Sequence, residues 1–577
     1  MILHNFSGHT KRSFGSVFLS LPNALAGIGL AIFAASWLVA EHFRPWLSFH
    51  SEFVAFFALA VLVLGVLMGR SGAIAVPVVC APILVVAVVP LLQWMMKPGF
   101  FAGDMILSVL YLLVLAFALL VGYLLRGSSE SEAAGLPPLA MAITVAALLS
   151  AGIAWFQWLG VDDNYRRIMV SSEIGRAGGN LAQPNHLATL LLVGLSAYAY
   201  LFARHVIGRF TFAFGVAFIS IALAMTQSRT GILSASAIAV FWAFKCRNIA
   251  PRRSAFLLFL WVAVTFAVTR TLPFVSDALF ITSGALPRSI GDNGSRLDMW
   301  WQVAIAIAQS PWLGYGWNQT FTAQTVGALA HPGELAYLYA HNIVLDLIAW
   351  SGIPLGLLIV TAICYWFCSR LARVQSIEGV FAIAALIPIA LHSLLEYPFA
   401  YAYFLVAAGL LMGVAEASLP RLKTLAIARA WVGAVFGLWA VAGLWVAYEY
   451  VQIEADYRIV RFETLRIGTT PSSYSAPKIR LLSHMKVMLL AARVAVKPGM
   501  AADEIELLRK AASRFPYGLL SYKYAVTLAL NGELIAASRQ MAVLRGVFGE
   551  EYYAQSKAAF RRLGKEKFPQ LTEVSLP

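Results

Sequence analysis

The residues best suited to chemistry in this 577-residue chain are polar side chains that stand at the ends of long apolar runs. A polar or ionisable side chain at membrane depth is costly, so each of them is a functional candidate. Four short strings carry most of these residues, at 178–186, 227–230, 296–300 and 340–346. His392 and Glu396 stand near the end of a later apolar run.

His341 is the candidate general base. An imidazole group titrates near ambient pH, and it can therefore take a proton from a hydroxyl group. Asn342 follows it directly, and Asp346 is placed to lie roughly behind it. The alternative interpretation is a histidine that is only hydrogen-bonded with Asn342 at the start of a helix.

Arg229 and Arg296 are candidates for holding an anion, because a guanidinium group binds two phosphate oxygens at once. Arg229 is the only lysine or arginine of its short connection, and its alternative role is to cap the end of a span. Arg296 and Trp300 share a face if their stretch is helical. The alternative for this pair is a cation–π contact that fixes a surface helix.

The string at 178–186 combines turn formers with hydrogen-bonding side chains. Its two glycines and Pro184 permit a tight re-entrant turn. The side chains that can bind a polar ligand there are Asn180, Gln183, Asn185 and His186. The alternative is an interfacial turn with a capping asparagine.

The elements that position these residues are membrane spans. Hydrophobic residues make up 60% of the chain and charged residues only 12%, against roughly 25% charged in an average soluble domain. The apolar residues form unbroken runs near or above the roughly 18 residues that indicate a span. We therefore expect an all-α, polytopic integral membrane protein. A disordered chain, a disulfide-stapled scaffold and a soluble nucleic-acid binder are excluded.

The apolar runs predict about thirteen spans. The weakest are the short run 230–245 and the closely spaced pair around Glu396. The predicted spans are 23–40, 52–69, 73–92, 105–125, 138–159, 186–203, 210–226, 230–245, 254–270, 342–366, 379–395, 399–415 and 430–449.

The distribution of basic residues orients these spans. With the N-terminus in the cytoplasm, fifteen lysines and arginines fall in the inner short connections and six in the outer ones. The positive-inside rule favours this orientation. It places 41–51, 160–185, 271–341 and everything after about 450 outside, which is the periplasm of a Gram-negative cell. All four polar strings then lie on the outer side.

The chain divides by composition into two parts. Residues 1–450 form a transmembrane domain with a large periplasmic loop at 271–341. Residues 451–577 regain charges and apolar residues at helical spacing, which predicts a small periplasmic helical domain. The stretch 505–548 indicates two helices, the second broken at Asn531 and Gly532, in the manner of tetratricopeptide-like helix pairs.

The sequence offers no sign of a cofactor or a metal. It contains no Walker A motif, no compact set of carboxylates and no zinc-binding arrangement of His and Cys. We expect a reaction that needs neither a metal ion nor a cofactor.

In order along the chain, the motifs resemble those of the O-antigen ligase superfamily. They are the string 180–186, Ser228 to Thr230, Arg296 with Trp300, the turn 311–316 and the pair His341–Asn342. Within that superfamily, the chain is most similar to the bacterial O-oligosaccharyltransferases that glycosylate proteins such as pilins. The resemblance covers roughly 170–450.

The resemblance implies a multi-pass enzyme of the bacterial inner membrane. Its donor would be an oligosaccharide on undecaprenyl pyrophosphate, and its acceptor a hydroxyl group of a pilin-like or other periplasmic protein. His341 would be the base that deprotonates the acceptor, while Arg229 and Arg296 would hold the pyrophosphate. A single displacement would invert the anomeric centre. The string at 180–186, Trp300 and Glu396 remain candidates for substrate binding.

Two other functions stay open. The same enzyme class includes O-antigen ligases, which join glycan to lipid A core, and O-antigen polymerases. A different class is a polytopic transporter or flippase, although the two halves of the chain show no repeat and the polar strings lie on one side.

Overall fold

The computed structural model describes residues 20–97, 99–126, 136–171, 175–249, 251–281, 294–420 and 423–577. This part of the chain is predominantly α-helical, with a single two-stranded sheet. The prediction of an all-α polytopic protein is confirmed. Lys11, Arg12 and Arg421 of the charge count lie outside the described residues, as does the segment 282–293 of the large loop.

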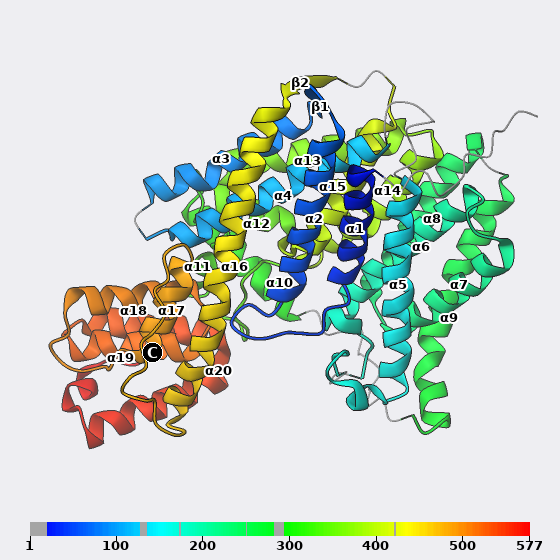
Figure 1. Cartoon of the computed structure of the whole chain (residues 1–577). Helices are drawn as coiled ribbons and strands as arrows, with labels where there is room; N and C mark the ends of the chain where they lie inside the picture. The colour runs from blue at the N-terminus through cyan, green and yellow to red at the C-terminus, as the bar shows by residue number, and fades with distance from the viewer. Residues whose placement is uncertain are drawn as a thin grey trace, which may run out of the picture.

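Helices occupy every predicted span, in the order of the sequence (Figure 1). Seven of them are long and apolar enough to cross a membrane, and the exact number of spans stays a prediction. The helices are α1 (Leu21–Ser36), α2 (Phe49–Gly69), α3 (Cys80–Met96), α4 (Ala102–Arg126), α5 (Leu136–Trp158), α6 (Pro184–Ala203), α7 (Arg209–Met225), α8 (Arg229–Ile249), α9 (Arg253–Ala278), α12 (Ile343–Ser351), α13 (Ile353–Arg373), α14 (Ile377–Ser393), α15 (Ala402–Ala417) and α16 (Arg429–Leu465).

The prediction of a span over 73–92 is wrong at its beginning. Residues Ala73–Pro77 form strand β1, which pairs antiparallel with β2 (Thr424–Ala428). A short apolar run fits a strand as well as a helix, and only the distant partner decides between them. Helix α3 begins after the strand, at Cys80.

The prediction of one unbroken span over 342–366 is also wrong. Gly352 separates α12 from α13, with a φ of 81° that favours glycine. A Cβ atom at this position would lie 2.3 Å from the carbonyl oxygen of Trp312, so the close approach also requires glycine. Helix α13 then begins at Ile353, with Pro354 in its first turn, where a missing N–H is tolerated.

Two helices extend beyond the C-terminal ends that were predicted for their spans. Helix α9 continues to Ala278, so the connection predicted over 271–341 begins later than 271. Helix α16 continues to Leu465, well past 449. The change in composition near 450 therefore falls within one helix, whose Glu449 accepts hydrogen bonds from the N–H groups of Arg480, Leu481 and Leu482.

The C-terminal helices are α17 (Ser483–Arg493), α18 (Ala502–Arg514), α19 (Gly518–Leu530) and α20 (Leu534–Glu566). The predicted break at Asn531 and Gly532 is present, because α19 ends at Leu530 and Gly532 has a φ of 88°. Helix α20 bends at Gly549, which lies outside helical geometry. The likeness to tetratricopeptide pairs stays a prediction.

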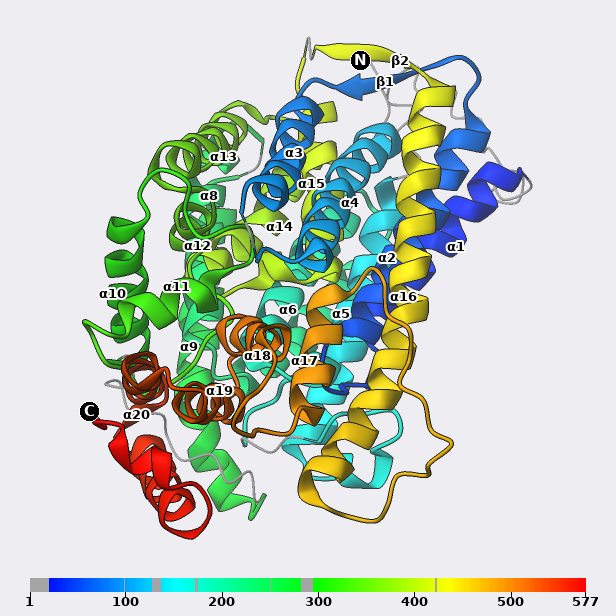
Figure 2. The ribbon, with the colours of Figure 1, turned by 90° about the vertical axis from the view of Figure 1, so that its left-hand side faces the viewer.

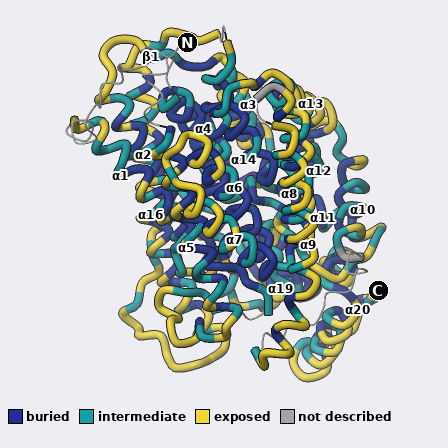
Figure 3. The backbone as a smooth tube through the Cα atoms, turned by 90° about the vertical axis from the view of Figure 1, so that its right-hand side faces the viewer, coloured by how far each residue is buried: buried dark blue, intermediate teal, exposed yellow. Residues whose placement is uncertain are grey.

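The centre of the bundle is formed by α4, α6, α14 and α15, whose residues are mostly buried (Figure 3). Helices α4 and α15 approach closely, since a Cβ atom on Gly122 would lie 2.0 Å from the carbonyl oxygen of Leu410. Small residues permit such contacts between membrane helices. Helices α9, α13 and α16 expose most of their apolar residues, as expected for helices that face lipid.

The two ends of the bundle differ in character. The strands β1 and β2 lie at one end, and the C-terminal helices lie at the other (Figures 1 and 2). The pairing of the strands places the connections at 73–77 and 424–428 on the same side, as the charge count requires. The long connection between α9 and α12 contains α10 (Gly294–Gln309) and α11 (Thr320–Gly327), and α11 packs against α18 and α20.

This arrangement yields a test of the orientation. Five spanning segments separate Arg252 from Gly468 if α12 and α13 cross together. We expect a reporter that is active only in the periplasm to be active when fused after Gly468 and inactive when fused after Arg252. The same activity from both fusions would contradict an odd number of crossings between them.

Candidate active site

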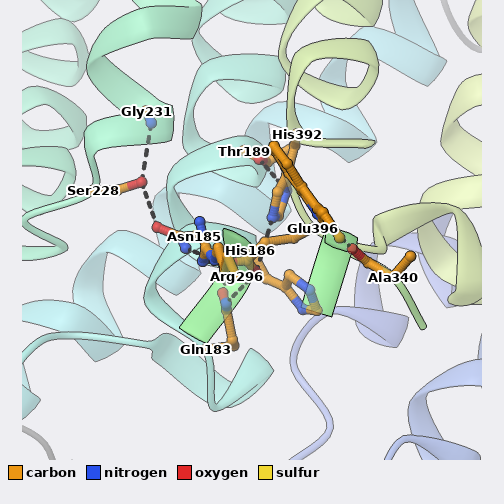
Figure 4. A network of polar contacts seen from close by, with 11 residues as sticks. Gln183, Asn185, His186, Thr189, Ser228, Gly231, Arg296, Ala340, His392 and Glu396 are labelled. Atoms are coloured by element: carbon orange, nitrogen blue, oxygen red, sulfur yellow. Dashed lines mark hydrogen bonds and ion pairs between the residues drawn. The ribbon is translucent and has the colours of Figure 1, made fainter. Parts of the chain in front are cut away.

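The carboxylate of Glu396 is the centre of a polar cluster at the end of the bundle that carries the C-terminal helices. Its Oε1 accepts hydrogen bonds from Nη2 of Arg296 at 2.8 Å and from Nδ2 of Asn185 at 2.6 Å. Its Oε2 accepts one from Nε2 of Gln183 at 2.6 Å (Figure 4). Glu396 is only 4% exposed, and a buried charge is stable only with such partners.

A second branch of the cluster leads to α8. Oδ1 of Asn185 accepts a hydrogen bond from Oγ of Ser228 at 2.7 Å, and Ser228 accepts one from the N–H of Gly231 (Figure 4). Ser228 directly precedes Arg229, which is exposed at the start of α8. A chain of three hydrogen bonds therefore joins the segment of Arg229 to Arg296.

Arg296 keeps binding capacity despite its contact with Glu396. Its side chain is 31% exposed, and only Nη2 is committed to the carboxylate. A guanidinium group has five N–H donors, so further donors remain for an anion. The alternative interpretation of this pair, a cation–π contact, does not apply, because Nε1 of Trp300 donates to the carbonyl oxygen of Ala340 at 2.8 Å.

Histidines extend the cluster toward the bundle. Nδ1 of His392 lies 2.8 Å from Oγ1 of Thr189, and its Nε2 lies 3.4 Å from Oε2 of Glu396. Among the described residues, one group of three side chains that could bind a metal ion lies close together. It consists of His186, His392 and Glu396. An arginine and two amides already donate to the carboxylate, so a cation would meet N–H groups there. We assign no metal.

His341 lies between α11 and α12, with its ring roughly perpendicular to the rings of two tyrosines. The centroid of the Tyr397 ring is 4.7 Å away and that of Tyr337 is 5.5 Å away. Nδ1 of His341 is buried and has no hydrogen-bond partner among the described residues. Asn342 caps α12 through the N–H groups of Val344 and Leu345, so it serves its own helix.

The three helices that begin at this site start in the same way. A non-glycine residue with a positive φ is followed by a residue whose side chain accepts a hydrogen bond from the first turn. Such backbone costs roughly 1–3 kcal/mol per residue and persists only where the surroundings hold it. The three pairs are Ala182–Gln183, Gln227–Ser228 and His341–Asn342.

The charges of the cluster act on one another. Burial raises the pKa of Glu396, but the hydrogen bond from His392 and the positive charges around it outweigh burial and lower that pKa to about 2. Burial lowers the pKa of His341, the Glu396 carboxylate raises it and the Arg296 guanidinium lowers it again, with a net value of about 4. His341 is therefore neutral at ordinary pH, as a base must be.

The structure brings most of the predicted residues together, with exceptions. Asn180 lies in the short helix η3 (Gly179–Leu181). Its side chain is hydrogen-bonded to the backbone of Leu38, Ile168 and Val170. Asp346 lies behind the loop of His341, but it contacts the N–H of Ala340 and not the imidazole. The predicted roles in binding and catalysis stay predictions.

Sequence reasoning missed the aromatic surroundings of His341. Tyr397 follows Glu396 directly, and its ring also stacks on Tyr339 at 5.0 Å. The string Glu396–Tyr397–Pro398 was the available signal, since a polar residue beside a proline between two apolar runs indicates a shaped turn. Nothing in the spacing shows that this turn meets a loop 55 residues earlier.

Three stretches of the chain match known protein families. Residues 177–202 match the protein glycosylation ligase family, and residues 214–360 match the O-antigen ligase family. Residues 380–563 match the C-terminal part of the virulence factor membrane-bound polymerases. Together the matches contain every residue of the polar cluster.

Two characterised relatives come from Acinetobacter baylyi. A general O-oligosaccharyltransferase is 28% identical over 537 residues, which covers 91% of this chain and 92% of the relative. A ComP-specific O-oligosaccharyltransferase is 26% identical over 403 residues, covering 69% and 72%. Because the similarity to the first covers 91% of this chain, it includes at least part of the C-terminal helices.

The charges around His341 predict opposite effects of two neutral substitutions. Glu396→Gln removes a negative charge and should lower the pKa of His341 below about 4. Arg296→Gln removes a positive charge and should raise it. Carbethoxylation of His341, followed by peptide mass spectrometry against pH, reports the neutral fraction. A midpoint near 6.5, or shifts of the same sign, would contradict this account.

Proposed function

We propose that this chain transfers a preassembled glycan from undecaprenyl pyrophosphate to a hydroxyl side chain of a protein. The chain belongs to the O-antigen ligase superfamily and is a glycosyl-transferring membrane enzyme. The observation that carries the proposal is the meeting of Arg296, the segment of Arg229 and His341 at one end of the bundle. An anion site beside a neutral base is what such a transfer requires.

The donor pyrophosphate binds to Arg296 and Arg229. Negative charge grows on the leaving phosphate oxygen as the bond to the sugar breaks, and two guanidinium groups stabilise it without a metal. Glu396 holds Arg296 by one nitrogen, which fixes the direction of its remaining donors. Arg229 is exposed and free to meet the second phosphate.

His341 activates the acceptor. Its neutral imidazole takes the proton of the hydroxyl group while the hydroxyl oxygen attacks the anomeric carbon. The bond from that carbon to the pyrophosphate oxygen breaks with its electron pair on the phosphate, and the anomeric centre is inverted. The charge of a bound pyrophosphate raises the pKa of His341 from about 4 toward neutrality, where a general base works best.

A protein is the acceptor that the relatives favour. Both are named as O-oligosaccharyltransferases, and the general enzyme matches nearly the whole chain. Transfer to lipid A core is the second candidate, because residues 214–360 match the O-antigen ligase family. A flippase is disfavoured, since the polar cluster lies at the ends of α6, α8 and α14, whereas transporter sites lie near the midplane.

The enzyme acts in the inner membrane, with its N-terminus in the cytoplasm. The cluster and the C-terminal helices then face the periplasm, where lipid-linked glycan and folded acceptor proteins meet. The asymmetry of basic residues supports this orientation.

A reconstituted assay tests the acceptor. Purified protein in liposomes receives labelled undecaprenyl pyrophosphate-linked glycan together with a pilin-like protein, with lipid A core or with glycan alone. We expect label on serine or threonine of the protein. Label only on lipid A core, or only in longer glycan, would identify a ligase or a polymerase instead. The same transfer should continue in excess chelator, and a loss restored by Mg²⁺ or Mn²⁺ would overturn the metal-free mechanism.

Substitutions should separate the base from the anion site. His341→Ala should lower the rate by about 10²–10⁴-fold with donor affinity nearly intact, because the base acts on the acceptor. Arg296→Ala and Arg229→Ala should weaken donor binding and also slow transfer. Arg→Lys should rescue only in part, since an ammonium group lacks the bidentate fork.

The measurements are donor affinity and single-turnover rate, in variants that insert and fold normally. Asp163→Ala is a suitable control, because this exposed carboxylate of the outer loop lies outside the cluster. A His341→Ala variant with the wild-type rate would show that His341 is only the residue before a helix.

A further inference from the structure

Ala340, the residue before His341, is held on both sides of its backbone by side chains. Its N–H donates to Oδ1 of Asp346 at 2.9 Å. Its carbonyl oxygen accepts from Nε1 of Trp300 at 2.8 Å. Ala340 is 0% exposed, so water does not compete for either of its two hydrogen bonds. The peptide groups that lead into His341 therefore have one fixed direction.

Asp346 is itself held in place. Oγ1 of Thr320, on α11, donates to its Oδ1 at 2.6 Å, and Nε1 of Trp350 donates to the same hydroxyl oxygen at 2.7 Å. Asp346 is 0% exposed, and its Oδ2 has no partner among the described residues. Burying a carboxyl group with so few donors is costly, so its presence calls for a role that an apolar residue cannot fill.

The backbone of His341 needs such support. Its φ of 53° lies in the left-handed region, which residues other than glycine adopt only where neighbouring contacts impose it. Asn342, the residue after His341, is fixed because its side chain caps α12. Ala340, the residue before His341, is fixed by its two backbone hydrogen bonds. The direction of the imidazole thus follows from contacts on both sides of one strained residue.

We propose that Trp300 and Asp346 are positioning residues, which hold the Ala340 peptide and thereby aim the His341 imidazole. This inference rests on the proposed role of His341 as the base. Trp300 lies one helical turn from Arg296 on α10. The same helix therefore carries the anion-binding arginine and the tryptophan that donates a hydrogen bond to Ala340. The base and the pyrophosphate site are therefore set relative to each other by one rigid element.

The neighbouring tryptophans provide a matched test. Trp300→Phe keeps an aromatic ring and removes only the N–H that Ala340 accepts. We expect kcat to fall by about tenfold to a hundredfold with donor affinity unchanged within about twofold, because a small misplacement of a catalytic group costs this much. Trp301→Phe is the control, since Trp301 is 61% exposed, and it should leave kcat unchanged. Equal rates for the two variants would overturn the proposal.

Asp346 allows a rescue experiment. Asp346→Asn keeps an oxygen that can accept from Ala340 and Thr320, so it should retain kcat within about threefold. Asp346→Leu removes both bonds and should lose at least as much kcat as Trp300→Phe. Thermal unfolding of each purified variant identifies any that fail to fold, and Thr320→Val then replaces Asp346→Leu as the milder change. An Asp346→Asn variant as slow as Asp346→Leu would show that the charge matters and would overturn a positioning role.

A double substitution separates this inference from the proposed function. If Trp300 acts through His341, Trp300→Phe should have no further effect in a His341→Ala background. An equal loss in both backgrounds would overturn the positioning role while leaving His341 as the base. A His341→Ala variant with normal activity would instead remove the base assignment, and this inference would fall with it.

Discussion

The site depends on one buried carboxylate. Glu396, which follows α14, accepts hydrogen bonds from two other segments: from Gln183 and Asn185 at the start of α6, and from Arg296 on α10. Each of these segments starts or carries a different helix, so the carboxylate joins the ends of helices that are far apart in the sequence. Removing one partner of a buried, hydrogen-bonded charge leaves an unpaired group and is strongly destabilising. The polar cluster and the ends of these helices are therefore held by the same contacts.

The connections at this end combine strain with support. Three helices begin after a residue in left-handed conformation, and a polar cap follows each time. The C-terminal helices add further support: Arg514 forms a two-pronged ion pair with Asp104 at the start of α4, and the N–H of Gly333 donates to the carbonyl oxygen of Gly546. The loop that leads to His341 thus lies between the bundle and the C-terminal helices.

Sequence reasoning predicted the helices well where a long apolar run alone decides, and it predicted the polar strings because charge is rare in such a chain. It failed where a distant contact decides. The strand at Ala73–Pro77 depends on its distant partner Thr424–Ala428, and the break at Gly352 depends on the backbone of Trp312. The hydrogen bonds of Glu396 and of the Ala340 backbone also depend on tertiary contacts. The spacing of residues along the chain does not indicate these contacts.

The most direct test of this account is a structure of the protein in lipid with an undecaprenyl pyrophosphate-linked glycan bound, determined by cryo-electron microscopy. The account predicts phosphate oxygens within hydrogen-bond distance of Arg296 and Arg229, Arg296 still in contact with Glu396, and the His341 imidazole facing the anomeric carbon from the side opposite the phosphate. Phosphates bound away from both arginines, or a His341 ring that faces away from the sugar, would contradict it.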